Sequence, residues 1–130
     1  MMRIHQGVDI VEISRFREIV LRNDRFITDI FTEREREYCQ SMKDPYLHFA
    51  GRFAAKESYA KALGTGFSGS GIDHLFQEIE VIRTASGKPE ISASGWAAKI
   101  AKKRKIKQCS LSISHAFNYA VASVILVGGE

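Results

Sequence analysis

The spacing of apolar side chains along the chain predicts strands near both ends and helices between them. Residues 4–13 are rich in β-branched side chains, which favour a strand. Ser14 is a residue type that caps helices, and Phe16, Ile19 and Val20 follow it at the i, i+3, i+4 spacing of an amphipathic helix. The first 20 or so residues therefore predict a strand that leads directly into a helix.

Two further helices are predicted before a glycine-rich loop. Thr32 is a plausible cap for a helix over residues 33–42. Pro45 suits the first turn of a long helix over residues 45–63, which Gly64 can close.

The second half of the chain predicts a return to strands. The expected elements are a strand over residues 76–84, a turn at 86–89, a short strand near Ile91, a helix over 94–104, and strands over 108–114 and 119–127. The last two are close enough in sequence to form an antiparallel hairpin. Helices grouped between terminal strands predict an α+β fold, a small antiparallel sheet packed with helices, and 130 residues predict a single domain over 1–130.

The basic charge of the chain is concentrated in one segment. The 130 residues carry 19 Lys and Arg against 15 Asp and Glu, a net charge of +4. Six of the basic residues lie in 99–107, and the remainder of the chain holds 13 basic against 15 acidic residues. Such a cluster is more typical of a solvated helix end, and it lacks the interleaved aromatic residues of single-strand binders. A non-catalytic module that binds anions or nucleic acid through this cluster is the alternative function, and we rank it low and expect no nucleic-acid partner.

Other compositional features exclude several classes of protein. Cys39 and Cys109 are isolated, so they predict neither a metal cluster nor a disulfide framework. Residues 1–6 have no apolar core of a signal peptide, and the longest apolar stretch, 120–127, is far too short to span a membrane. We therefore expect a cytoplasmic protein without a membrane partner.

Two carboxylates lie in apolar surroundings on separate predicted elements. Asp9 interrupts the apolar run of the first strand, and Glu57 lies beside the apolar stripe of the long helix. Because burial of an unpaired charge is costly, a partner is expected, and Lys61 at i+4 makes a helical ion pair with Glu57 the favoured interpretation on this evidence alone. If Asp9 and Glu57 meet, they suit a hard cation such as Mg²⁺, which takes one or two carboxylates together with water and phosphate oxygens.

Two other segments carry weaker signals. Residues 64–71 contain four glycines whose amides can approach phosphate, but the segment lacks the Gly-Lys-Ser/Thr of a P-loop, so a helix cap followed by a loop is favoured. Ser110, Ser112 and Ser114 share one face of the predicted strand, with His115 on the other. No Ser-His-Asp triad can be identified around these serines.

Four motifs occur in order along nearly the whole chain. They are GVDIVEISR at residues 7–15, GRFAAKESYAKALGTG at 51–66, GKP at 87–89 and SISH at 112–115. A chain with these four motifs in this order resembles the holo-acyl-carrier-protein synthase family, the small bacterial type of 4′-phosphopantetheinyl transferase. The resemblance implies that the protein transfers 4′-phosphopantetheine from coenzyme A to a serine of apo-acyl carrier protein, in support of fatty acid biosynthesis. The other product would be adenosine 3′,5′-bisphosphate.

The resemblance also implies roles for individual residues. Asp9 and Glu57 would hold Mg²⁺ or, alternatively, Mn²⁺, and Lys61 would neutralise the phosphates of coenzyme A. Glu57, directly or through water, would help to deprotonate the attacking serine. Asp9, Glu57 and Lys61 are therefore the expected catalytic residues. The residues expected around coenzyme A are Arg52, Lys61, Gly64, Gly87, Lys88, Pro89 and His115. Ser86 replaces an asparagine common before this Gly-Lys-Pro motif.

The first helix is the expected docking surface for the acidic carrier protein. Arg15 and Arg22 are seven residues apart and share a helix face with Ile19 between them, and Arg25 follows. Arginine side chains around an apolar residue suit an acidic amphipathic partner helix, whereas a solvated helix face is the alternative. The resemblance further implies a homotrimer with active sites between protomers, although the sequence does not assign each residue to a protomer.

Overall fold

The computed structural model describes residues 1–64 and 72–129, and within them the elements alternate much as the sequence predicts. In chain order they are β1 (Arg3–Glu12), α1 (Ile13–Arg22), α2 (Phe26–Ile30), α3 (Glu33–Gln40), α4 (Pro45–Leu63), α5 (Ile72–Glu78), β2 (Ile79–Arg83), β3 (Pro89–Ala93), α6 (Gly95–Lys103), β4 (Ile106–Ala116) and β5 (Tyr119–Gly128). Of the predicted glycine-rich loop at residues 64–71, residues 65–71 lie outside the described residues.

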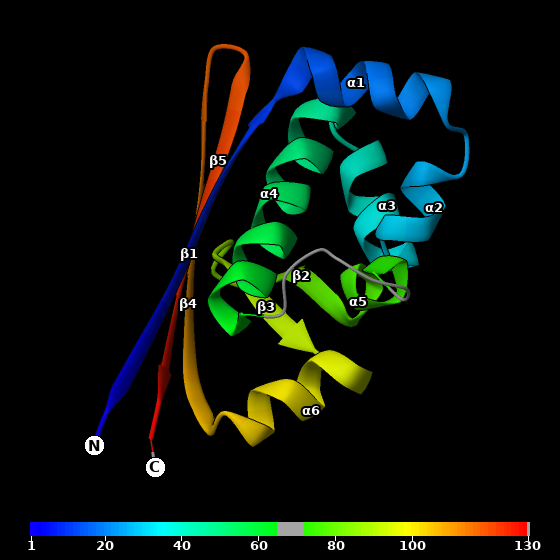
Figure 1. The fold of residues 1–130 in the computed structure, drawn as a ribbon. Helices are drawn as coiled ribbons and strands as arrows, with labels where there is room; N and C mark the ends of the chain where they lie inside the picture. The colour runs from blue at the N-terminus through cyan, green and yellow to red at the C-terminus, as the bar shows by residue number, and fades with distance from the viewer. Residues whose placement is uncertain (65–71, 130) are drawn as a thin grey trace.

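The strands form two antiparallel sheets, one large and one small. The larger sheet has the order β1-β5-β4, so the first strand pairs with the last, and β2 pairs with β3 in the smaller sheet. Helix α4 packs against one face of the larger sheet, and α2, α3 and α5 lie on the far side of α4 (Figure 1). The predicted α+β class with small antiparallel sheets is therefore confirmed.

Helix α4 forms the centre of the molecule and is buried on most of its circumference. Small residues such as Ala54, Ala55 and Ala60 let the sheet and the other helices approach it closely. The approach is tightest at Gly7 of β1, where a Cβ atom would overlap the carbonyl oxygen of Ser58. Glycine at this position therefore fixes how closely β1 lies against α4.

A fully buried ion pair holds the helical layer together. Lys56 Nζ lies 2.8 Å from Glu35 Oε1, and both side chains are 0% exposed. Lys56 also donates to the carbonyl oxygens of Phe76 and Ile79, and Glu35 Oε2 accepts the amide of Val81. The pair thus joins α3 and α4 to the junction between α5 and β2.

The outer face of the larger sheet, opposite α4, is apolar and exposed. Ile4, Val8 and Ile10 alternate along β1 with residues that face α4, and their exposed fractions are 62%, 57% and 63%. Ile125 of β5 lies on the same face and is 38% exposed. The three serines of β4 also lie on this face, as their alternation predicts.

The structure differs from the predicted elements at three main places. The short helix α2 was not predicted. Residues 76–78 belong to α5 rather than to a strand, because the buried Lys56 binds carbonyl oxygens at the end of this helix, a contact that local sequence does not reveal. The third difference concerns the start of α1, where Glu12 rather than Ser14 occupies the N-cap.

Asn118, from the turn between β4 and β5, caps α1 instead of Ser14. Its side-chain oxygen accepts the Ser14 amide at 3.0 Å, its backbone oxygen accepts the Ile13 amide at 2.7 Å, and its Nδ2 donates to Ser14 Oγ at 2.8 Å. The predicted Thr32 cap is confirmed, as a capping box with Glu35. No helix among the described residues has the length and apolar character needed to cross a membrane.

Candidate active site

The structure brings together the three residues predicted to be catalytic. Asp9 on β1 shares a side-chain hydrogen bond with Glu57 on α4, and Lys61 Nζ lies 2.8 Å from Asp9 Oδ1. Lys61 also donates to the backbone oxygen of Val8 at 3.3 Å. The predicted helical pair between Glu57 and Lys61 is thus replaced by an ion pair across the two elements, because β1 lies close enough for Lys61 to reach Asp9.

This arrangement makes Glu57 an unusual carboxyl group. Burial, the negative charge of Asp9 and the hydrogen bond to Asp9 raise the pKa of Glu57 to about 8, although the nearby Lys61 lowers it somewhat. Two interacting carboxyl groups titrate as one coupled site, and a nearby positive charge favours loss of the proton. The pair can therefore hold a divalent cation or exchange a proton near neutral pH.

A hollow beside the two carboxyl groups connects them to α1. The hollow has a volume of about 260 Å³, and its lining includes Asp9, Glu57, Arg15 and Ile19 together with apolar side chains. A second hollow, on the outer side of α1, is lined by Glu12, Arg15, Glu18, Ile19 and Arg22. Arg15 and Ile19 therefore lie at the boundary between the carboxylate pair and the exposed face of α1.

Arg25, the fourth residue predicted for docking, lies at the N-cap of the next helix, α2. Its backbone amide donates to Asn23 Oδ1, and its side chain does not line either hollow in the part of the chain that the structure describes. The predicted shared face of Arg15, Ile19 and Arg22 is present, with Arg25 beyond its end.

A second cluster, rich in cationic and aromatic side chains, surrounds Arg52. Its guanidinium lies 4.1 Å from the ring centroid of Tyr38, and its buried Nε has no hydrogen-bond partner among the described residues. The rings of His48 and His115 lie 6.2 Å apart, and His115 Nε2 is 3.2 Å from the carbonyl oxygen of Leu47. Burial lowers the pKa of His48, and the charges of Arg52 and His115 lower it further.

The turn that contains Gly87, Lys88 and Pro89 adjoins the cluster around Arg52. Gly87 has φ +88°, and a Cβ atom there would lie 3.5 Å from Nη2 of Arg83. Arg83 also donates to the Tyr38 hydroxyl at 3.3 Å. Arg83 thus connects the Gly87 turn with the Tyr38 ring on which Arg52 stacks.

Helix α4 separates the two clusters. At about 100° per residue, Glu57 and His48 lie roughly 180° apart around the helix, and Arg52 lies about 140° from Glu57. In this chain, therefore, the carboxylate pair and the cluster around Arg52 face different directions.

Gly64, predicted to contact coenzyme A, ends α4 in the left-handed conformation with φ +76°. A Cβ atom at this position would lie 2.8 Å from Nη1 of Arg104. The structure therefore places Arg104, from the basic segment 99–107, against the C-terminal end of α4.

Three residues of the Arg52 cluster were not predicted from the sequence, namely Tyr38, His48 and Arg83. His48 lies four residues before Arg52, so helical spacing alone could have placed both on one face of α4. Tyr38 and Arg83 come from α3 and the end of β2, and no local pattern connects them with α4. Among the described residues, no group of three or more His, Cys, Asp or Glu side chains is arranged to hold a metal ion.

Known proteins share both the sequence and the fold of this chain. Residues 6–124 match the family described as the 4′-phosphopantetheinyl transferase superfamily. A protein of Caldanaerobacter subterraneus subsp. tengcongensis named Holo-[acyl-carrier-protein] synthase is 45% identical over 129 residues, which cover 99% of this chain and 98% of that protein.

Two solved structures extend the similarity to complexes with coenzyme A. The ACPS–CoA complex of Chronobacterium ammoniagenes has a TM-score of 0.86 at 30% identity and covers 98% of this chain and 99% of its own. The holo-(acyl-carrier-protein) synthase of Bacillus anthracis str. Ames, in complex with CoA (3′,5′-ADP), has a TM-score of 0.78 at 36% identity, with coverage of 99% and 100%. This chain therefore belongs to the 4′-phosphopantetheinyl transferase superfamily, in its holo-[acyl-carrier-protein] synthase family.

Proposed function

We propose that the protein acts as one domain, over residues 1–130, that carries out holo-[acyl-carrier-protein] synthesis with Asp9, Glu57 and Lys61 at its reacting centre. The activity follows from family membership: 4′-phosphopantetheine passes from coenzyme A to a serine of apo-acyl carrier protein, with release of adenosine 3′,5′-bisphosphate. The observation that supports the catalytic assignment is the hydrogen bond between Asp9 and Glu57 beside Lys61.

The carboxylate pair fits one divalent cation, Mg²⁺ or alternatively Mn²⁺. Two carboxyl groups that share a proton, with the pKa of one raised to about 8, favour replacement of that proton by a metal ion. Mg²⁺ commonly takes only one or two protein carboxylates and completes its octahedron with water and phosphate oxygens. When bound, it would offset the charge that develops on the pyrophosphate as the phosphorus–oxygen bond breaks.

The side chains around this pair would orient and activate the reactants. The Lys61 side chain is 44% exposed, so its Nζ can turn from Asp9 toward a pyrophosphate oxygen and neutralise part of its charge. Glu57 would accept the proton of the carrier serine, directly or through a water molecule. The serine oxygen then forms a bond to the phosphorus of the phosphopantetheine, and the bond from that phosphorus to the bridging oxygen breaks, so that adenosine 3′,5′-bisphosphate leaves with the electron pair.

The cluster around Arg52 suits the nucleotide end of coenzyme A. An unpaired guanidinium donor, two imidazole rings and the aromatic ring of Tyr38 provide contacts for a phosphate and for a planar base. We assign Arg52, His115 and the Gly87-Lys88-Pro89 turn to this end, and Gly64 to the pyrophosphate near Lys61.

The exposed face of α1 suits the acidic carrier protein. Arg15 and Arg22 flank Ile19, and Arg15 and Ile19 also line the hollow that contains Asp9 and Glu57. A carrier helix on this face would bring its serine close to the reacting centre, with Arg25 as a further contact beyond the end of α1.

A homotrimer with sites between protomers accounts for two features of the fold. The carboxylate pair and the Arg52 cluster face opposite sides of α4, so one coenzyme A would contact Glu57 of one protomer and His115 of its neighbour. Ile4, Val8, Ile10 and Ile125 form an exposed apolar sheet face, and such a patch is typical of a subunit contact.

Mass spectrometry of the carrier protein tests the reaction and the role of Glu57. Incubation with coenzyme A, Mg²⁺ and apo-acyl carrier protein should add one phosphopantetheine to the carrier. Glu57→Gln should abolish the adduct while circular dichroism shows an unchanged fold, and Glu33→Gln, at an exposed position of α3, is the control. An active Glu57→Gln variant would contradict the assignment of Glu57.

Mixing two inactive variants tests whether sites lie between protomers. Glu57→Gln and His115→Ala should each be inactive. Subunits exchanged between them should regain part of the activity, because a mixed trimer contains one interface with both native residues. No recovery after demonstrated subunit exchange would indicate sites built within one protomer.

A further inference from the structure

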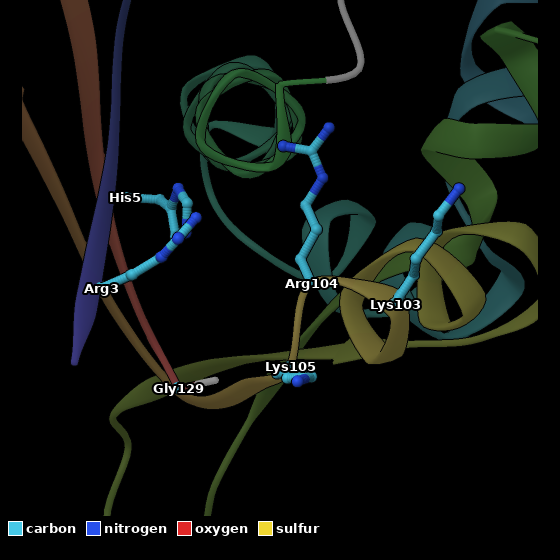
Figure 2. Close-up of a pocket in the computed structure, with 6 residues that line it drawn as sticks. All are labelled: Arg3, His5, Lys103, Arg104, Lys105 and Gly129. Carbon is cyan, nitrogen blue, oxygen red and sulfur yellow. The ribbon is translucent and has the colours of Figure 1, made fainter. Parts of the chain in front are cut away.

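A basic cavity lies at the end of the molecule where β1, the α6–β4 turn and the C-terminal segment meet. Its volume is about 440 Å³, and its lining residues are Arg3, His5, Lys103, Arg104, Lys105 and Gly129. Figure 2 shows Arg3 and His5 extending from β1 on the side that faces Arg104. Residues nearly a hundred positions apart in sequence thus contribute cationic or imidazole side chains to one hollow.

The backbone holds the basic turn in a defined conformation. Lys105 has φ +58°, a left-handed conformation that is unfavourable for a residue with a side chain. The Gly129 amide donates to the Lys105 carbonyl oxygen at 3.1 Å, and a Cβ atom at Gly128 would lie 3.0 Å from that oxygen. The C-terminal segment therefore packs tightly against the turn and fixes the direction in which Lys103, Arg104 and Lys105 leave it.

No carboxylate within the described part of the chain neutralises the positive charge of this cavity. No acidic residue lines it, and none of its basic side chains forms an ion pair with a carboxylate among residues 1–64 and 72–129. Two arginines, two lysines and one imidazole around a concave space make a favourable environment for a compact anion with several negative charges.

We propose that this cavity binds a small phosphate-bearing anion, either inorganic pyrophosphate or the phosphates of a nucleotide. Arginine and lysine together bind phosphate oxygens through charge-assisted hydrogen bonds, and the volume of the hollow suits a small molecule rather than a polymer. The basic segment 99–107, to which the proposed transfer reaction assigns no role, thereby gains a function.

The cavity contains none of the three residues of the reacting centre and lies apart from the proposed subunit contact, and Arg104 alone also reaches the C-terminal end of α4 at Gly64. His5 lies four residues from Asp9 along β1, about 13 Å at the usual rise of a strand. Arg3 and His5 alternate with Ile4, so they lie on the side of β1 opposite the exposed apolar face. A trimer formed through that face would therefore leave the cavity open to solvent.

Site-resolved NMR of the full chain tests the proposal. In EDTA, inorganic pyrophosphate should cause saturable shifts of the Lys105 and Gly129 amide signals. The double variant Lys103→Gln/Arg104→Gln should weaken this binding about tenfold or more, because two charged hydrogen-bond donors are lost. Both side chains are exposed, and a thermal melt verifies the fold.

The matched control removes the same charge from the same segment. Lys99→Gln/Lys102→Gln changes two lysines that do not line the cavity, and it should leave pyrophosphate affinity nearly unchanged. Equal weakening in both double variants, or shifts that do not saturate, would overturn the proposal, since either result indicates general attraction to positive charge.

A parallel titration with adenosine 3′,5′-bisphosphate distinguishes the two sources of phosphate. Tighter binding of the nucleotide at the same two amides would identify a nucleotide site, and equal affinity would identify phosphate alone as the recognised group. If neither compound shifts the Lys105 and Gly129 amide signals, the proposed site is refuted.

Discussion

Lys61 Nζ of α4 lies 2.8 Å from Asp9 Oδ1 of β1, so the cation bridges two elements instead of pairing along its own helix. This contact leaves Glu57 beside a second carboxyl group with which it shares a hydrogen bond, and the pKa of Glu57 rises to about 8. The three side chains therefore form one electrostatic unit, in which a change to any member alters the charge state of the others.

Removing the Lys61 charge should reduce catalysis far more than stability. We expect Lys61→Met to lower kcat/KM for coenzyme A by about 10²-fold or more, the usual cost of losing a group that stabilises developing charge. Unfolding free energy should change by less than about 1 kcal/mol, because the ion pair is partly exposed. Lys99→Met on α6 is the control, and a Lys61→Met variant with native kcat/KM would contradict this role.

The raised pKa of Glu57 predicts that stability in EDTA falls as pH rises. Between pH 4.5, the ordinary pKa of a glutamate, and about pH 8, the unfolded chain has lost the Glu57 proton and the folded chain still holds it. Rising pH therefore favours the unfolded state across this window. Urea denaturation at several pH values should show this decline in the native protein and a shallower one in Glu57→Gln; identical slopes would contradict the prediction.

Breaking the buried pair of Lys56 and Glu35 should destabilise the protein strongly. Lys56→Met leaves the Glu35 carboxylate buried without its cation, at a cost of about 3–5 kcal/mol in unfolding free energy. Adding Glu35→Gln should restore part of this stability, because the amide removes the unpaired charge and keeps an acceptor for a backbone amide. Urea denaturation measures both variants, and purely additive losses would show that the two residues are not coupled.

A methyl group at Gly7 should disturb both packing and catalysis. In Gly7→Ala the Cβ atom overlaps the Ser58 carbonyl oxygen, so β1 must move away from α4. We expect a loss of about 1–3 kcal/mol in stability, together with lower transferase activity as Asp9 separates from Glu57. Ser92→Ala, at an exposed position of β3, is the control. A fully active and stable Gly7→Ala variant would show that the contact is not needed.

A charge on the outer sheet face should prevent subunit association. Ile10→Lys should yield folded monomers in light scattering and lose transferase activity, because burying an unpaired lysine in an apolar contact is unfavourable. Leu21→Lys replaces an equally exposed apolar residue on α1 and should leave the oligomer intact. If active Ile10→Lys protein still forms trimers, the subunit contact must lie elsewhere on the molecule.

Local patterns predicted most of the fold because they report local interactions. The span of α4 follows from Pro45 and Gly64, and the β4–β5 hairpin from two apolar runs separated by a short turn. Lys56 illustrates what such patterns cannot provide. Its 0% exposure and its bonds to α5 and β2 depend on tertiary packing, and no periodicity indicates that a lysine will be central.

The candidate site likewise has some features that the sequence predicts and others that only the folded chain reveals. The order of the four motifs identified Asp9, Glu57 and Lys61 as a group, and the structure brings them into contact. The partner of Lys61 was predicted incorrectly, because helical spacing considers only neighbours on the same element. The links from Arg83 to Tyr38 and from Arg104 to Gly64 join segments far apart in sequence, so they emerge only from the folded chain.

The cap that Asn118 provides for α1 makes the start of this helix dependent on a residue 104 positions later in the chain. During synthesis, the first turn of α1 emerges from the ribosome long before Asn118 does, and it lacks these three hydrogen bonds until the β4–β5 hairpin has formed. The helix that presents Arg15, Ile19 and Arg22 is therefore fixed at its start only late in synthesis. An incomplete chain would therefore present the proposed docking surface for the acyl carrier protein with a frayed first turn.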